Sequence, residues 1–315
     1  MAANLQDDAT VFPIATNALI ERERRKSIML RAWIFSGLFF MTLPGTVLGF
    51  SNLLAISTHH GLGSLPAAWI QGHGHAQVFG WIGSFILGIG FYSQPSQRRS
   101  VLRIPLTCFA LWTSGVGMRW AANIYAWNWR ILFLISAGFE LIAVLLFLAA
   151  ASRHKLSEPT QNKKTKPAME LWMISVLLGT VGLTALVIFN FVECLRLAMR
   201  GTLAAFPYAL DQRFLVLLAW GFLVPMVWGF SARWLPAFLS IAKPNAHWFQ
   251  TALMLDLMGV LCGVWAGPKP RPFCWREARP QLCRRCTSHN ARSARQRFKA
   301  FTAASRSSSG SRIYG

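Results

Sequence analysis

The segment ILFLISAGFELIAVLLFLAAA, residues 131–151, decides the fold of this chain. Its one ionisable side chain is Glu140, near the middle. At a rise of about 1.5 Å per residue, the segment forms a helix of about 30 Å, which matches the hydrocarbon core of a bilayer. The segment therefore predicts a transmembrane helix.

Similar apolar segments recur along the chain, and the charged residues fall between them. Of 315 residues, 54% are hydrophobic and 14% are charged. Arg119 closes one apolar segment, Asp256 interrupts another, and Pro44 and Pro225 predict kinks. The sequence thus predicts an all-α, polytopic transmembrane helical bundle of about seven spans. The predicted spans are residues 32–57, 75–92, 104–122, 131–151, 171–193, 214–240 and 250–267.

These spans divide the chain into three parts. Residues 1–31 form a cytoplasmic N-terminal segment, whose mixed acidic and basic residues do not resemble a cleavable signal peptide. Residues 32–267 form the transmembrane domain, and residues 268–315 form a basic, low-order tail. With the N-terminus inside, the cytoplasmic side carries about fifteen Lys and Arg residues and the outer side about five, as the positive-inside rule requires. The loop before the second span then faces outward.

The tail carries about half of the net charge of +21. It holds twelve of the 32 basic residues and one of the 11 acidic residues. The remaining charge is ordinary for the loops of a multi-span protein, so the composition does not indicate nucleic-acid binding. Three interpretations of the tail stay open: a disordered basic segment, a zinc site of the form C-x8-C-x2-C-x2-H beginning at Cys274, or a departure from the proper reading frame near Gly267.

The head of the second span, residues 72–81 (GHGHAQVFGW), carries the main candidate functional residues, His73, His75 and Gln77. Imidazole is scarce beside hydrocarbon unless it binds something. Successive helical residues are about 100° apart, so His73 and His75 point about 160° away from each other. One regular helix therefore cannot direct both histidines at one metal ion.

On this helical wheel His73 and Gln77 share a face with Gly80, Ser84 and Gly88. Small residues four positions apart allow a neighbouring helix or a flat macrocycle to approach the backbone closely. A histidine at the head of such a groove suits axial ligation of haem, with the ring lying along the helix. Ordinary helix packing beside a solvated histidine is the alternative.

Two further histidines, His59 and His60, lie in the preceding outer loop. Together with His73 and His75 they place four imidazoles within a short stretch on one side of the membrane. Imidazole suits both haem iron and copper, so all four are candidate metal ligands. A histidine-rich loop that is merely solvated is the alternative.

The stretch HGHAQVFGW, residues 73–81, resembles the H-x-H-x-x-x-F-G-[FW] signature of the NnrS family. These are bacterial multi-span membrane proteins that contain haem and copper and are linked to nitric oxide stress. The segment SARWLPAF, residues 231–238, is similar to a second segment of that family, in which Arg233 corresponds to an arginine followed by an aliphatic residue and a proline. Ala76 departs from the pattern, since many relatives carry an acidic residue there.

The resemblance covers most of residues 30–267. It implies a haem cofactor, with copper as a further metal, in the bacterial inner membrane, and a small-molecule ligand such as nitric oxide. It also implies that this chain is a truncated member of a family with about twelve spans.

The same span is similar to the second helix of haem-copper oxidase and nitric oxide reductase catalytic subunits, where a histidine ligates low-spin haem. A complete oxidase site is not expected, because His154 and His247 fall in predicted loops. A relative of these subunits in respiratory electron transfer is one alternative function. A metal-free proton-coupled transporter is another, and it would use Glu140 and Asp256.

Four ionisable residues lie inside or near the ends of the other predicted spans: Glu140, Glu193, Arg233 and Asp256. An ionised carboxylate in hydrocarbon costs roughly a few kcal/mol unless it is paired. Glu140 therefore predicts a proton path, an internal ion pair, or a neutral acid bonded to a neighbouring helix. Glu193 is expected to do the same or to meet the headgroups. Arg233 is expected to pair with an acid or a haem propionate, or to snorkel.

Overall fold

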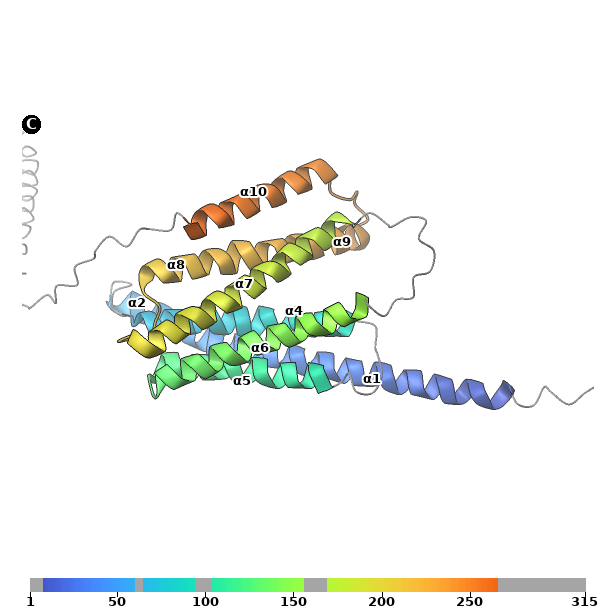
Figure 1. Ribbon diagram of the computed structural model, residues 1–315, viewed down its shortest axis with the longest axis horizontal. Coiled ribbons are helices and arrows are strands. Elements are labelled where there is room, and N and C mark those ends of the chain that lie inside the picture. The colour runs from blue at the N-terminus through green and yellow to red at the C-terminus, as the bar shows by residue number, and fades with distance from the viewer. Residues whose placement is uncertain (1–7, 60–64, 94–102, 156–168, 266–315) are drawn as a thin grey trace, which may run out of the picture. The chain divides into compact units, whose positions relative to one another are not determined.

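The computed structural model describes residues 8–59, 65–93, 103–155 and 169–265 (Figure 1). This part of the chain is almost entirely helical and contains no strand, so the predicted all-α bundle is confirmed. The elements are α1 (Asp8–Phe40), η1 (Met41–Val47), α2 (Leu48–His59), α3 (Ala67–His75), η3 (Ala76–Gly83), α4 (Ser84–Ser93), α5 (Arg103–Tyr125), α6 (Trp129–Lys155), α7 (Leu171–Arg200), α8 (Tyr208–Val216), η5 (Leu217–Leu223), α9 (Val224–Leu239) and α10 (Ala246–Trp265).

Six helical stretches in the described part are long and apolar enough to cross a membrane. The helix α5 is not among them, because Arg103 and Arg119 lower its hydropathy. It nevertheless packs along α6 more extensively than any other pair of described elements, so it belongs to the bundle. The chain is a multi-pass membrane protein, and α5 is a member of its helical bundle.

The first helix begins earlier than the predicted span, at Asp8 rather than at residue 32. Figure 1 shows that its N-terminal turns extend beyond the neighbouring helices. Salt bridges one turn apart, such as Arg25 with Glu21 at 3.0 Å, connect charged residues there. These charged turns continue the helix outside the apolar span.

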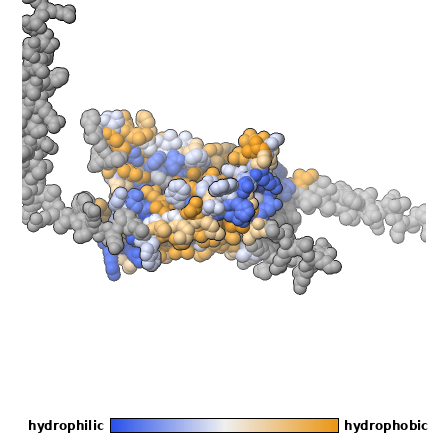
Figure 2. Space-filling model, turned by 90° about the horizontal axis from the view of Figure 1, so that it is seen from above, coloured by the Kyte–Doolittle hydropathy of each residue, from blue (hydrophilic) through white to orange (hydrophobic). Residues whose placement is uncertain are grey.

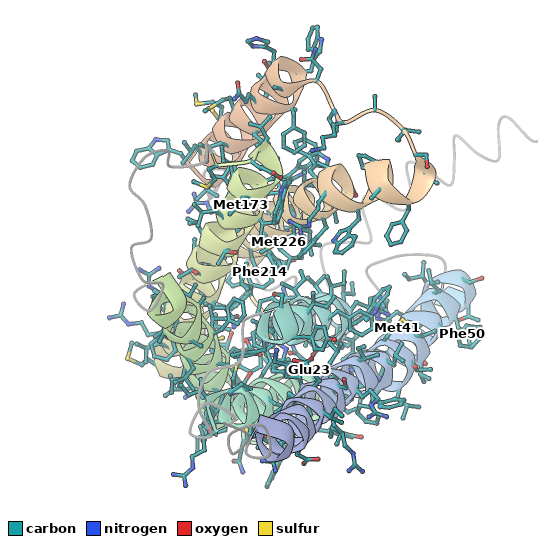
Figure 3. The ribbon with its side chains drawn as sticks, turned by 90° about the vertical axis from the view of Figure 1, so that its right-hand side faces the viewer. Glu23, Met41, Phe50, Met173, Phe214 and Met226 are labelled. Carbon is teal, nitrogen blue, oxygen red and sulfur yellow. The ribbon has the colours of Figure 1, made fainter. Side chains whose placement is uncertain are left out.

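The side chains that face outward are apolar, as contact with lipid requires. Phe35, Phe50 and Leu53 are each about two-thirds exposed, and Figure 2 shows hydrophobic surface beside hydrophilic patches on the face in view. In Figure 3, Phe50 points away from the bundle, whereas Phe214 lies in its interior and is 8% exposed. The outer surface of the bundle is therefore suited to the bilayer.

Three of the helical stretches contain a π-helical segment, η1, η3 or η5. In η1, Pro44 has no backbone N–H and so interrupts the regular helical hydrogen bonds. The kink predicted at Pro44 therefore takes the form of a π segment. Such segments leave backbone carbonyls open to other donors and are frequent at functional sites.

The face of Gly80 and Gly88 packs directly against α1. A Cβ at Gly80 would lie 2.5 Å from the Phe40 side chain, and one at Gly88 would lie 2.5 Å from that of Trp33. The small residues thus admit a neighbouring helix. The expectation that a flat ring lies along this face is wrong, because α1 fills it.

Candidate functional site

The π segment η1 positions the first histidine. The His73 ring bonds through Nδ1 to the Gly45 carbonyl oxygen at 2.9 Å. Gln77 donates to the Met41 carbonyl at 3.5 Å, a weak contact on the same face. The prediction that His73 and Gln77 share one face is therefore confirmed, and both satisfy carbonyls of the interrupted helix.

This bond decides the protonation pattern of the His73 ring. A carbonyl oxygen is an acceptor, so Nδ1 carries the hydrogen, and in the neutral ring Nε2 has a free lone pair. Histidines that ligate metals commonly donate their other ring N–H to a backbone carbonyl or a carboxylate, which fixes the ring. His73 has this arrangement.

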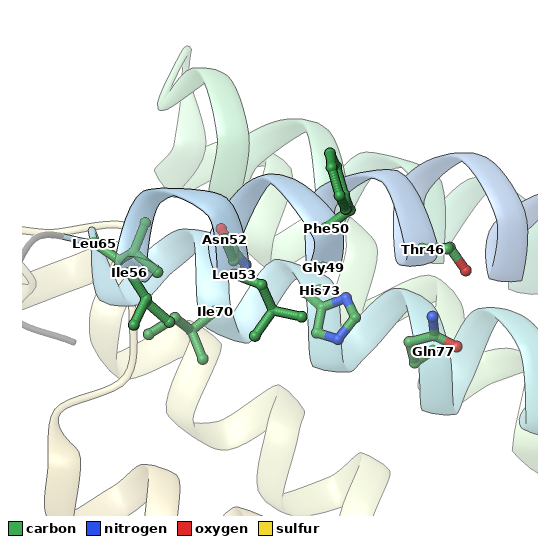
Figure 4. Close-up of a pocket in the computed structure, with 10 residues that line it drawn as sticks. All are labelled: Thr46, Gly49, Phe50, Asn52, Leu53, Ile56, Leu65, Ile70, His73 and Gln77. Carbon is green, nitrogen blue, oxygen red and sulfur yellow. The ribbon is translucent and has the colours of Figure 1, made fainter. Parts of the chain in front are cut away.

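The His73 ring lies at the wall of a pocket of about 540 Å³ between α2 and α3 (Figure 4). Gly49 allows the ring to lie close to α2, since a Cβ at that position would be 2.6 Å from His73 Cε1. Asn52 also lines the pocket, and its buried Oδ1 has no hydrogen-bond partner among the described residues. The other lining residues are Thr46, Phe50, Leu53, Ile56, Leu65, Ile70 and Gln77.

The pocket offers one free ring nitrogen, Nε2 of His73, and the rest of its wall is mainly apolar. It therefore suits a cofactor that needs a single nitrogen ligand from the protein. A haem held by a single axial imidazole has that requirement. In the part of the chain that the structure describes, no group of three or more His, Cys, Asp or Glu side chains is placed to hold a metal ion. Those residues alone therefore do not form the cluster of ligands that copper would need.

The second histidine lies on the opposite side of the helix, in the protein interior. His75 Nε2 is 2.7 Å from Glu140 Oε1, and the two side chains are 3% and 0% exposed. The ring stacks on Phe79 with centroids 4.3 Å apart and an interplanar angle of 17°. Glu140 of α6 is therefore paired with His75 of α3. Among the roles expected for Glu140, the structure shows the internal pair with a neighbouring helix.

A line of polar side chains continues from Glu140 into the bundle. Glu140 Oε2 accepts a hydrogen bond from Asn190 Nδ2 at 3.0 Å, and Cys194 Sγ is 3.6 Å from Asn190 Oδ1. Arg119 Nη1 donates to Cys194 Sγ at 2.6 Å. We call these five side chains, His75, Glu140, Asn190, Cys194 and Arg119, the buried polar chain.

The connection between α7 and α8, residues 201–207, covers one end of this chain. Gln71 both accepts from and donates to the Phe206 backbone, at 2.8 and 3.0 Å. Asn123 donates to the Ala204 carbonyl at 3.0 Å. Arg119 lies against the Phe133 and Phe206 rings, 3.9 and 4.8 Å from their centroids. The guanidinium is thus enclosed by aromatic rings.

Other predicted site residues lie apart from both sites. Glu193 is buried and bonds Arg196 at 2.5 Å, so the expectation that it meets headgroups is wrong. Arg233 is exposed and stacks on the Trp172 ring at 4.2 Å. Asp256 lies on α10, which packs against α7, α8 and η5, and its buried Oδ1 has no hydrogen-bond partner among the described residues.

Three candidates fall outside what the structure describes. These are the side chain of His59, residue His60 and the proposed zinc ligands of the tail. The tail's predicted boundary and its possible change of reading frame lie there too.

Sequence reasoning missed two members of the buried polar chain. The sequence places Arg119 at the end of a predicted span and gives no indication that Cys194 is its partner. The available signal was an arginine on a helix whose other residues are mostly apolar, since such a residue normally faces the bundle interior. Its partner, Cys194, is 75 positions away and carries no corresponding signal.

Fold and site together define a multi-pass helical membrane protein with a histidine-lined pocket and a separate buried polar chain. Comparisons of the sequence and structure with protein families, curated proteins and solved structures find no match.

Proposed function

We propose that this chain is a haem-binding protein of the bacterial inner membrane that acts in the response or resistance to nitric oxide. The N-terminus lies in the cytoplasm, and the His73 pocket faces the outer side. The observation that carries the proposal is the fixed ring of His73, whose Nε2 lone pair is free beside a pocket lined mainly by apolar residues.

In this proposal, His73 would hold the haem iron through Nε2, and the Gly45 carbonyl would orient the His73 ring. The apolar walls from α2 and α3 hold the macrocycle and exclude water. The haem, when bound, supplies an iron centre able to take a diatomic ligand. His75 is not a ligand, because Glu140 engages its Nε2. A copper role for His59 and His60 stays part of the proposal.

The test is an absorption spectrum of the detergent-solubilised protein, produced with ample haem precursor. We expect a Soret band in the parent and in His247→Ala, a control that removes an exposed histidine of α10. We expect His73→Ala to lose at least 90% of this band per chain, or about tenfold in haem content. Adding nitric oxide to the reduced parent should shift the band saturably. A parent without haem contradicts the proposal.

A further inference from the structure

Arg233 is an exposed cation on an otherwise apolar part of the bundle surface. It lies on α9, six residues before that helix ends, which is about 9 Å from the end of the helix. Its exposed neighbours on the last turns of α9 are apolar, namely Trp234, Leu235, Phe238 and Leu239. Such a surface contacts lipid, where a cation is costly unless an anion or water reaches it.

Close packing of α9 on the first turns of α7 places Arg233 over the Trp172 ring. Gly229, one turn before Arg233, permits this approach, since a Cβ there would lie 2.9 Å from the Trp172 carbonyl oxygen. The guanidinium carbon is 4.2 Å from the Trp172 ring centroid and 5.6 Å from that of Trp234. Glu170 accepts a hydrogen bond from Trp172 Nε1, which orients the indole. The fold therefore holds this cation in a defined position.

The stacked arrangement leaves the edge of the guanidinium group available to a ligand. Arginine carries five N–H donors in the plane of this group, whereas stacking on a ring occupies only its face. None of the ion pairs among the described residues includes Arg233. An oriented guanidinium of this kind matches a phosphate group, which accepts two parallel hydrogen bonds from it. The chemistry of the site therefore favours a phosphate.

The surroundings of Arg233 favour a phospholipid as the source of that phosphate. Trp172 is the second residue of α7, and indole rings at the ends of membrane spans lie among the lipid headgroups. A phospholipid places its phosphate at this level, and its acyl chains cover the apolar neighbours of Arg233. In the sequence, residues 156–168 before α7 include three lysines and one glutamate, and Lys243 follows α9. Basic residues near the membrane surface attract anionic lipids.

We propose that Arg233, Trp172 and Trp234 form a binding site for the headgroup phosphate of an anionic phospholipid. The guanidinium group donates hydrogen bonds to two phosphate oxygens, and the two indole rings hold the guanidinium in place. The acyl chains extend over the exposed apolar side chains of α9, such as Phe238. This site goes beyond the function proposed above, because it is separate from the His73 pocket and does not depend on haem.

The test measures lipid binding to the delipidated, detergent-solubilised protein by native mass spectrometry. The probes are phosphatidylglycerol and phosphatidylcholine with identical acyl chains. We expect the first phosphatidylglycerol molecule to bind at least about fivefold more tightly than phosphatidylcholine. Arg233→Gln should lose this preference, whereas Arg200→Gln, which removes an exposed arginine at the other end of α7, should retain it. Inorganic phosphate at millimolar concentration should not displace the lipid.

Two further variants separate a stacked site from general attraction to a basic surface. Trp172→Leu should weaken phosphatidylglycerol binding in the parent but not in Arg233→Gln, because the two side chains act together. Arg233→Lys keeps the charge without the planar fork and should bind this lipid less tightly than the parent. The proposal is overturned if the parent binds both lipids equally, if Arg233→Gln or Arg233→Lys binds like the parent, or if inorganic phosphate displaces the lipid. An undiminished effect of Trp172→Leu in Arg233→Gln overturns it as well.

Discussion

Replacing Gly49 by alanine tests how tightly the His73 pocket is built. The added Cβ would lie 2.6 Å from His73 Cε1, whereas ordinary contacts begin at 3.4 Å, so the ring must move by about 0.8 Å. A shift of that size away from Gly45 would stretch their 2.9 Å hydrogen bond beyond a useful length. Overpacking of this kind costs about 1–3 kcal/mol.

The assay is the free energy of unfolding in mixed micelles, together with the NMR signals of the His73 ring. The control is Gly74→Ala on the neighbouring helix, because an added Cβ there meets nothing within 4 Å. That variant should match or exceed the parent in stability, since alanine is the better helix former by up to about 1 kcal/mol. If Gly49→Ala is as stable as Gly74→Ala and its ring signals are unchanged, the close packing of η1, α2 and α3 is refuted.

Three further variants test the packing of the bundle. In Gly182→Ala, the added Cβ would overlap the Gly221 carbonyl and should push α7 away from η5. We expect this variant to lose at least about 2 kcal/mol of stability in a thermal melt. Equal melting temperatures of parent and variant would refute that contact. Trp33 of α1 is 0% exposed, so Trp33→Ala should lower the free energy of unfolding by about 3–5 kcal/mol. Phe35 of the same helix is 67% exposed, so Phe35→Ala should lower it by under about 1 kcal/mol. Similar losses in the two variants would contradict the buried and exposed faces assigned to α1. Arg119→Met removes the hydrogen bond to Cys194 Sγ and the cation packed against the Phe133 and Phe206 rings, and should cost about 1–3 kcal/mol, measured as the denaturant midpoint; an unchanged midpoint would show that these contacts do not stabilise the fold.

The sequence was sufficient to predict the helices because the bilayer imposes a length and a composition on each span. It also predicted that His73 and His75 face different ways, since a helix rotates by about 100° per residue. The structure confirms this, with His73 on the η1 carbonyl and His75 on Glu140.

Long-range partners were not predictable from one sequence. Nothing in the local pattern connects His75 with a glutamate 65 positions later, because helix pairing depends on the whole packing arrangement. The π segments were missed as well, since Pro44 and Pro225 indicate only a kink and no proline marks η3. Trp33 and Phe40 of α1 fill the small-residue face, which a helical wheel cannot distinguish from a groove for a ligand.

The central claim of this account is that two histidines on one short helix serve two different sites. The most direct measurement is the Soret absorbance per chain of His73→Ala and His75→Ala, purified side by side from cells supplied with haem precursor. The account predicts that the band is lost in His73→Ala and retained in folded His75→Ala. Loss in His75→Ala with retention in His73→Ala, or retention in both, would contradict it.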